Sequence, residues 1–483
     1  MNQLTTLDAS FLKAEDADRH VSLAIGGIAV LDGSAPDYAR LKTTLAERIR
    51  TIPRCTQVLR VFPFDMGAPE WVDDPGFDIS RHVRRIAVPR PGDDTELYRV
   101  VADLMERRLD RTRPLWECWI IEGLAGNRWA MLMKIHHCMA DGVSATRILT
   151  GLCDATGGNV VAAPGAANRA TIPPSRRPQL PDLNPSRWAH SVWRVASAAA
   201  DTAARALGGA AEIAVGLARP AARSSLIGPV TAMRRYRAVQ VPLADVENVC
   251  RRFDVTINDV ALAAITEGFR TVLLHRGEQP RPDSLRTLVP VSVRSADALD
   301  TPDNRISVML PYLPVDQDDP VEQLRTVHTR LTRTKQGGQR QAGRVIVSAA
   351  NHIPFMVSSW AIRLLTRLPQ RGIVTLATNV PGPRHRLQIM GHRVLSVLPV
   401  PPIALQLRTG VAVLSYADEL VFGITADYDA AADVEKLADG IALAVARLVA
   451  LSRDSVLLFP HAPGQRRDAS AAVAGGARRP SSA

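Results

Sequence analysis

The residues of this sequence best suited to chemistry lie in one short segment, HHCMADG. It places His136 beside His137, with Asp141 and Gly142 four and five residues after His137. Such a group can hold a metal ion, can supply an imidazole as general base beside an orienting aspartate, or can form a buried turn. A metal site needs a third nearby ligand, and no HxH, HExxH or CxxC spacing supplies one. A GxSxG segment is also absent, so a serine-hydrolase triad is not indicated.

Strand periodicity separates the two histidines. The segment RWAMLMKIHH (128–137) alternates like a strand, in which successive side chains point to opposite faces. One face carries the larger apolar side chains and ends in a histidine: Trp129, Met131, Met133, Ile135 and His137. His136 shares the other face with Lys134. After the strand, Asp141 is predicted to cap a helix, and an imidazole ending an apolar row is expected to stay neutral near pH 7.

Length and composition describe a large globular chain. With 483 residues, two domains are expected. Five cysteines without CxxC spacing indicate neither a disulfide framework nor a zinc site, and they fit a reducing compartment. The first residues lack a basic segment followed by an apolar run, and no stretch of about 18 apolar residues occurs. We therefore expect a cytoplasmic protein that at most lies on a membrane surface.

The chain is basic, with a formal net charge of +11. Aromatic residues make up only 5% of it and do not alternate with basic residues, so nucleic-acid binding is not indicated. A polyphosphate head group such as that of an acyl-CoA, or an anionic membrane, would match the same charge.

Composition divides the chain into four parts, and their boundaries are 1–160, 161–235, 236–455 and 456–483. The first and third parts are mixtures of helical and strand patterns, compatible with a duplicated fold. The second is a linker that continues into amphipathic helices at 187–219, and the fourth is a low-complexity tail expected to be disordered. Predicted helices lie at 38–50, 93–110 and, as a pair, within 244–277. Predicted strands lie at 20–33, 128–137, 285–294, 306–316, 372–382 and 410–427.

At HHCMADG the sequence resembles the HHxxxDG motif of the bacterial wax ester synthase/diacylglycerol acyltransferase family, which includes mycobacterial triacylglycerol synthases. The resemblance extends over about residues 4–455, with one departure at Asp303, where the family more often has glycine. Condensation-type domains share HHxxxDG, whereas the ordered set of further blocks is specific. These blocks are LDASFL (7–12), RPLWE (113–117), TINDVALAAI (256–265), PVSVR (290–294), DNRISVMLPYLPVD (303–316) and NVPGP (379–383).

The resemblance implies an α/β (α+β) fold of two chloramphenicol-acetyltransferase-like subdomains, related by a pseudo-twofold. A tunnel between them would reach the motif histidine. It further implies that His137 deprotonates the hydroxyl of a diacylglycerol or long-chain alcohol, which then attacks the thioester carbonyl of an acyl-CoA. Acyl-CoA is a co-substrate in this scheme, and no resident cofactor or metal is expected. Direct transfer needs no covalent acyl-enzyme, because a thiolate leaves readily.

The resemblance also gives roles to the neighbours of His137. Asp141 is expected to hold the loop through an ion pair, with Arg294 as the candidate partner. Gly142 would allow a close backbone approach at the start of the helix, and His136 is expected to be an accessory residue.

The oxyanion of the tetrahedral intermediate needs a hydrogen-bond donor. Asn258 and Asn379 are the candidates. Alternatively, Asn258 caps a helix and Asn379 belongs to a turn before Pro-Gly-Pro. The Pro-Leu-Trp segment (114–116) is expected in the core rather than at the substrate.

Several functions remain open at this point. The leading one is an acyl-CoA:diacylglycerol O-acyltransferase, at the inner face of a membrane or on a lipid droplet. Alternatives are a wax ester synthase, a condensation enzyme served by a carrier protein, and a low-activity lipid-binding relative. The segment 358–371 could be an interfacial helix or an ordinary surface helix. The basic segment 332–344 could contact CoA phosphates or be a solvated loop.

Overall fold

The computed structural model describes residues 3–154, 224–292, 306–336, 372–404 and 406–454. Several predicted features lie outside these residues, and they are most of the linker 161–235, the helices at 187–219, Arg294, the helix at 358–371 and the tail 456–483. The described helices are α1 (Thr6–Ala17), α2 (Tyr38–Ile49), α3 (Asp94–Glu106), α4 (Gly142–Gly151), α6 (Leu243–Phe253), α7 (Ile257–His275), α8 (Pro320–Gln336) and α11 (Val434–Asp454). Three short 3-10 helices lie at Pro53–Thr56, Pro63–Asp65 and Ile79–Arg81.

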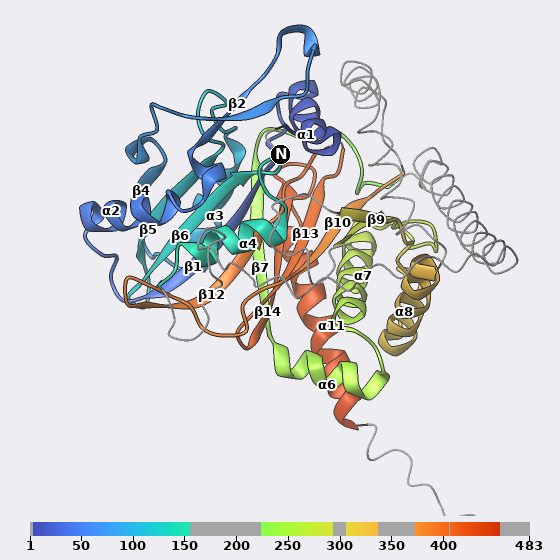
Figure 1. Ribbon diagram of the computed structural model, residues 1–483. Coiled ribbons are helices and arrows are strands. Elements are labelled where there is room, and N and C mark those ends of the chain that lie inside the picture. Colours follow the sequence, from blue (N-terminus) through green and yellow to red (C-terminus); the bar gives the residue numbers. More distant parts are fainter. Residues whose placement is uncertain (1–2, 155–223, 293–305, 337–371, 405, 455–483) are drawn as a thin grey trace, which may run out of the picture.

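The strands alternate with these helices along the chain (Figure 1). In the first half they are β1 (Ala24–Asp32), β2 (Gln57–Arg60), β3 (Glu70–Asp73), β4 (Val83–Ala87), β5 (Trp116–Leu124) and β6 (Arg128–His136). In the second half they are β7 (Arg234–Pro242), β8 (Thr287–Ser292), β9 (Ile306–Met309), β10 (Thr375–Pro381), β11 (Gln388–Ile389), β12 (His392–Val400), β13 (Thr409–Tyr416) and β14 (Glu419–Asp427).

Side-chain caps mark where several helices begin. Asp37 and Asp93 accept the backbone N–H groups of Arg40 and Glu96, which satisfies donors that a first helical turn leaves unpaired. In α2 the apolar residues at four-residue spacing, Leu41, Leu45 and Ile49, are the ones that become buried. The helices predicted at 38–50 and 93–110 are therefore confirmed as α2 and α3.

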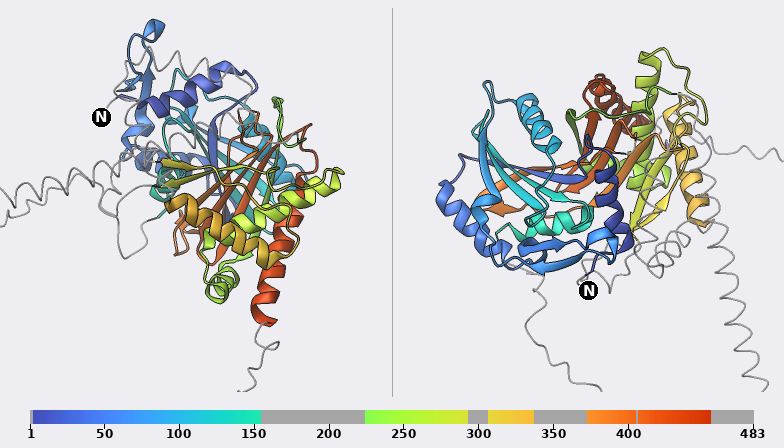
Figure 2. Two further views of the ribbon diagram at one scale, coloured as in Figure 1. Left: turned by 90° about the vertical axis from the view of Figure 1, so that its right-hand side faces the viewer. Right: turned by 90° about the horizontal axis from the view of Figure 1, so that it is seen from above.

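The two large sheets repeat one topology, which confirms the expected two-subdomain α/β architecture. The first sheet has the order β11-β12-β1-β6-β5-β4 and the second β7-β14-β13-β10-β8-β9. Within them, β1-β6-β5-β4 and β7-β14-β13-β10 have the same pattern of two antiparallel pairings followed by one parallel pairing. Helices α6, α7, α8 and α11 pack beside the second sheet (Figure 2).

The two sheets do not follow the division at residue 236. Strands β11 and β12 come from the predicted 236–455 part but extend the first sheet, where β12 pairs with β1 over Gly26–Leu31. Strand β12 also packs against β14 of the second sheet, and only a glycine fits there. A Cβ on Gly423 would lie 1.7 Å from the Pro399 carbonyl oxygen. The Tyr236 hydroxyl donates to the same oxygen at 2.9 Å, so β12 joins the two halves.

Several predicted elements have different limits in the structure. The strand predicted at 306–316 ends at Met309, before Pro311, and 410–427 is a hairpin of β13 and β14. Residues 332–336 of the predicted basic loop belong to α8, and the rest of that loop lies outside the described residues. Strand β5 has no predicted counterpart, because buried apolar residues lie on both of its faces and its sequence lacks alternation.

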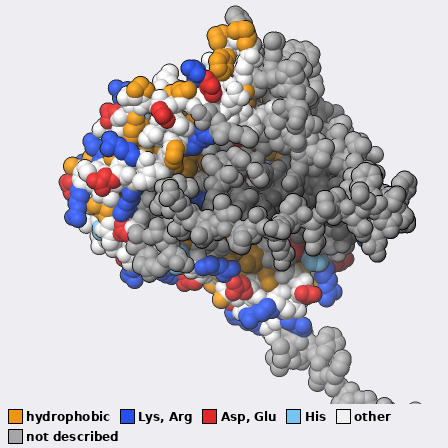
Figure 3. Space-filling view, in the orientation of Figure 1, with side chains coloured by type: hydrophobic (Ala, Val, Ile, Leu, Met, Phe, Trp, Pro, Cys, Tyr) orange, Lys and Arg blue, Asp and Glu red, His pale blue; other side chains and the backbone are white. Residues whose placement is uncertain are grey.

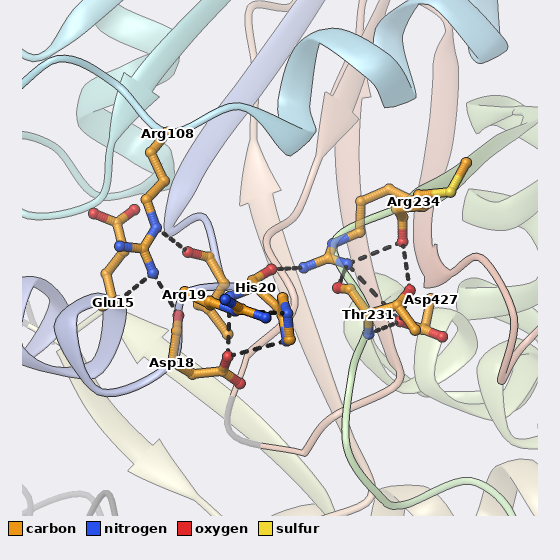
Figure 4. Close-up of polar contacts among 10 residues, drawn as sticks. Glu15, Asp18, Arg19, His20, Arg108, Thr231, Arg234 and Asp427 are labelled. Atoms are coloured by element: carbon orange, nitrogen blue, oxygen red, sulfur yellow. Dashed lines mark hydrogen bonds and ion pairs between the residues drawn. The ribbon is translucent and has the colours of Figure 1, made fainter.

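Arg234, at the start of β7, connects the halves through polar contacts. Its guanidinium donates to the His20 carbonyl at 2.7 Å and lies 3.8 Å from the buried Asp427 carboxylate (Figure 4). On the α1 side of the same cluster, Arg108 donates to the backbone carbonyls of Glu15, Asp18 and, at 2.9 Å, Val21. Arg108 thus holds the end of α1, and Arg234 of the second half holds the segment that follows it.

The described surface mixes charges. On the face in Figure 3, Lys and Arg side chains are interspersed with Asp and Glu over the residues shown in colour. Among the described residues, none of the helices combines the length and apolar character needed to cross a bilayer.

Candidate active site

His137 follows the last residue of β6 and faces a cavity between the two halves. The predicted alternation is confirmed, because Met133, Ile135 and His137 all line this cavity. Lys134 and His136 point to the other side of the sheet. There the buried Lys134 amine donates to the carbonyls of Leu104, at 2.7 Å, and Arg107.

Both sheets contribute to the cavity, which has a volume of about 140 Å³. Its walls are mostly apolar, and its polar side chains come from the HHCMADG turn, α4 and β10. The residues that line the cavity from the first half and β12 include Ile25, Gly27, Leu149, Val397 and Pro399. Those that line it from the facing sheet are Pro290, Leu376, Thr378, Asn379, Val380, Ala412 and Leu414. Such a lining suits an apolar substrate with one reactive polar group.

The His137 ring is held on one face by an aromatic side chain. Phe11 of α1 stacks on it, with ring centroids 4.2 Å apart and an angle of 16° between the planes. The backbone N–H of His137 donates to the Leu23 carbonyl at 2.9 Å. Burial lowers the pKa of His137 below its ordinary value of 6.5, against the opposing charge of Asp141. The imidazole is therefore neutral, and able to accept a proton, at pH 7.

Asp141 caps α4, as predicted from the sequence. Its carboxylate accepts the N–H of Ser144 at 2.7 Å and is buried. Gly142 begins the helix where it meets the second sheet, because a Cβ there would lie 2.8 Å from Cγ2 of Val380. The expected close approach at Gly142 is thus present, and its neighbour is β10. The candidate ion-pair partner of Asp141, Arg294, lies outside the described residues.

His136 lies outside the cavity and in a buried polar cluster. Its Nδ1 accepts the N–H of Cys138 at 3.1 Å, and its Nε2 lies 3.5 Å from the Glu15 carboxylate. Glu15 also accepts from Arg111 at 2.6 Å and from the N–H of Leu23 at 3.0 Å. Burial opposes its ionisation, but these partners lower the pKa of Glu15 to about 2. Sequence reasoning missed Glu15, although it follows the LDASFL segment on the same helix.

The two asparagine candidates differ in position. Asn379 lines the cavity from within β10, so the alternative that placed it in a turn is wrong. Asn258 is the second residue of α7 and is not among the residues that line the cavity. The predicted N-cap role of Asn258 is also wrong, because Thr256 caps α7 and forms a reciprocal capping box with Asp259.

The Pro-Leu-Trp segment lies in the core, as expected. Leu115 and Trp116 are buried, and the Trp116 indole donates to the Cys55 carbonyl at 2.8 Å. All five cysteines are free thiols. In the described ranges, no three His, Cys, Asp or Glu side chains are grouped closely enough to hold a metal ion.

Comparisons with known proteins match this arrangement. The model of the wax ester synthase/diacylglycerol acyltransferase catalytic domain matches residues 4–261, and that of the WS/DGAT C-terminal domain matches residues 303–448. The probable diacylglycerol O-acyltransferase tgs1 of Mycobacterium tuberculosis is 60% identical over 453 residues, covering 94% of this chain and 97% of the relative. A second putative diacylglycerol O-acyltransferase of that species is 54% identical over 484 residues, covering 99% and 97%.

Solved structures agree. The wax ester synthase/diacylglycerol acyltransferase of Marinobacter aquaeolei VT8 superposes with a TM-score of 0.65 at 25% identity, covering 93% of this chain and all of that one. The first condensation domain of the CDA synthetase, at 16% identity and a TM-score of 0.57 over 93% and 97% of the two chains, shares the fold. The family inferred from the sequence is confirmed by these matches. The chain is an acyltransferase that belongs to the wax ester synthase/diacylglycerol acyltransferase family.

Proposed function

We propose that the protein transfers the acyl group of an acyl-CoA to the free hydroxyl of a diacylglycerol, which yields triacylglycerol and CoA. The observation that carries the proposal is the neutral His137 on the wall of an apolar cavity lined by both sheets. The names of the two mycobacterial relatives support diacylglycerol as the acceptor.

His137 acts as the general base in this proposal. Its imidazole takes the hydroxyl proton while the hydroxyl oxygen attacks the thioester carbonyl, forming a C–O bond. The tetrahedral intermediate then collapses, the C–S bond breaks, and the imidazolium returns the proton to the CoA thiolate. Stacking on Phe11 and the bond from its own N–H fix the ring during both transfers. The chain's own residues suffice for this step without a resident cofactor.

The other residues around His137 hold the reacting groups in place. Asp141 fixes the start of α4 through its cap on Ser144. Asn379 faces the same cavity from β10, so its side-chain amide is our candidate donor to the oxyanion. Thr378 lines the cavity beside it and offers a hydroxyl.

The test is turnover of labelled oleoyl-CoA by the purified protein with dioleoylglycerol or hexadecanol as acceptor. His137→Ala is expected to lower the rate about 10²- to 10⁴-fold, the usual contribution of a general base. The control is the same substitution at the exposed His385. Unchanged turnover of His137→Ala would refute the mechanism, and preference for hexadecanol would identify a wax ester synthase. No product from either acceptor would favour a lipid-binding relative. Activity should survive exhaustive chelation.

We further propose that the protein is cytoplasmic and takes its acceptor from a lipid surface, such as a membrane or droplet. The segment between β2 and β3 projects from the molecule (Figure 1) and exposes Val61 and Met66 at 55% and 67%. Exposed apolar side chains on a projecting loop are suited to insertion between lipids. The test is sedimentation with vesicles of phosphatidylglycerol and dioleoylglycerol, which Val61→Ser/Met66→Ser is expected to weaken. Equal binding of this variant would refute the role of the loop.

A further inference from the structure

Helix α1 contacts the candidate base through Phe11 and the residues beside that base through Glu15. Phe11 and Glu15 are four residues apart and therefore lie on the same helix face. Phe11 stacks on the His137 ring, whereas Glu15 reaches the backbone around it. Glu15 is 1% exposed, carries a charge and does not line the cavity, so contact with substrate does not explain it.

The two oxygens of the Glu15 carboxylate begin two separate chains of contacts. Oε1 accepts the N–H of Leu23 at 3.0 Å, and the Leu23 carbonyl accepts the N–H of His137 at 2.9 Å. Oε2 lies 3.5 Å from Nε2 of His136, whose Nδ1 accepts the N–H of Cys138 at 3.1 Å. Because Nδ1 is an acceptor, the ring proton of a neutral His136 is on Nε2 and faces Glu15. The first series of contacts thus ends at the backbone N–H of His137, and the second ends at the backbone N–H of Cys138, the next residue.

We infer that Glu15 is a positioning residue, which holds His137 in its reactive orientation by fixing the backbone on both sides of it through Leu23 and His136. This role rests on the proposed function of His137. It also gives His136, the first histidine of the motif, a defined role, which is to transmit the hold of Glu15 to Cys138. Glu15 is itself held in place. Arg111 donates to its Oε2 at 2.6 Å, and Arg108 donates to backbone carbonyls at and after the end of α1 (Figure 4).

The charge of Glu15 suits this role. The charge and hydrogen bonds of its partners outweigh burial and lower its pKa to about 2, so both carboxylate oxygens remain hydrogen-bond acceptors at neutral pH. A glutamine has nearly the same shape but replaces one oxygen with a donor. It can keep the bond from the Leu23 N–H, while its amide would oppose the donors on His136 and Arg111.

The test compares Glu15→Gln with Asp16→Asn in the full-length protein. Asp16 is a matched control on the same helix, because it also binds Arg111, at 2.7 Å, but its side chain is 51% exposed. With oleoyl-CoA and dioleoylglycerol, Glu15→Gln is expected to lower kcat about 10- to 100-fold, as small misplacements of reacting groups do, with KM within about twofold. Asp16→Asn should keep both constants within about twofold. Wild-type kcat in a folded Glu15→Gln variant would overturn the inference.

A double variant tests the path. If Glu15 acts through His136, the kcat losses of Glu15→Gln and His136→Ala combine to less than their product. Full multiplication would mean independent actions and overturn the inference. Thermal unfolding identifies any variant that fails to fold. If Glu15→Gln does not fold, Glu15→Asp takes its place, because aspartate keeps the charge but has a shorter side chain. The same loss of kcat is expected for Glu15→Asp, and wild-type kcat in this variant would likewise overturn the inference. If His137→Ala also leaves turnover unchanged, the proposed function fails; if only Glu15→Gln does, this inference alone fails.

Discussion

Gly142→Ala should distinguish what the sequence suggests about α4 from what the tertiary structure requires. In an isolated helix, alanine in place of glycine stabilises by about 0.5–1 kcal/mol. Here the new Cβ would lie 2.8 Å from Cγ2 of Val380, whereas carbon atoms in contact are about 3.5–4.0 Å apart. Relieving an overlap of about 0.7 Å or more costs about 1–3 kcal/mol, as over-packing does in other cores. We expect a net loss of about 0.5–2 kcal/mol.

The same overlap should affect catalysis. Val380 is β-branched and has little freedom to rotate away, so α4 must move back from β10. The cap residue Asp141 and the cavity wall would move with it, and kcat should fall by up to about 100-fold. Urea unfolding and steady-state turnover measure the two effects.

A control and a second substitution make this prediction specific. Gly151→Ala, at the other end of α4, meets only Cδ1 of Ile52 at 3.5 Å and should change stability by no more than about 0.5 kcal/mol. Val380→Ala removes the atom that Gly142→Ala would strike, so the double variant should recover about 1 kcal/mol or more relative to additivity. The reasoning is refuted if Gly142→Ala lowers the unfolding free energy equally in the wild-type and Val380→Ala backgrounds, or if it stabilises the protein.

Two further predictions concern pH. Burial lowers the pKa of Lys134 from 10.5 to about 8, so its charged form costs the folded state about 3 kcal/mol below pH 8, and this cost disappears as the pH rises to 10.5. Between pH 8 and 10.5, the unfolding free energy of the wild type should therefore rise by about 3 kcal/mol relative to that of the Lys134→Met variant. The exposed residue Lys436 provides the control, because Lys436→Met should show no such change. A difference between wild type and Lys134→Met that does not change with pH would contradict this prediction. Because burial holds the pKa of His137 below 6.5, kcat/KM should fall towards acid pH with a midpoint below 6.5. A midpoint above 6.5 would show that the imidazole is not desolvated.

Local patterns predicted much of the first half correctly. Period-two alternation at 128–137 put His137 on the cavity side and Lys134 and His136 on the other. Asp141 caps α4 because the cap depends only on residues within one turn of each other. At α7 the same kind of inference failed, since Thr256 with Asp259 forms a capping box that excludes Asn258 from the cap.

Contacts between distant segments were beyond such patterns. Sequence spacing does not indicate that β12 leaves its own half to pair with β1, because strand pairing depends on long-range packing. Nor does it indicate that Glu15 lies 3.5 Å from His136, 121 residues later. A glutamate followed by an aspartate in a helix has the appearance of a surface residue until His136 of β6 and Arg111 of the loop between α3 and β5 are in place.

The sequence by itself determined the family, the reactive motif and the face of the strand on which each histidine lies, because these depend on residue identity and local periodicity. Only the tertiary structure decided which residues of the second sheet close the cavity opposite His137, that Val380 is the neighbour beside which Gly142 must remain small, and that α1 supports the motif through Phe11 and Glu15. These features arise where segments far apart in the chain are packed at van der Waals distance, and packing at that scale is fixed by the whole fold rather than by any one segment.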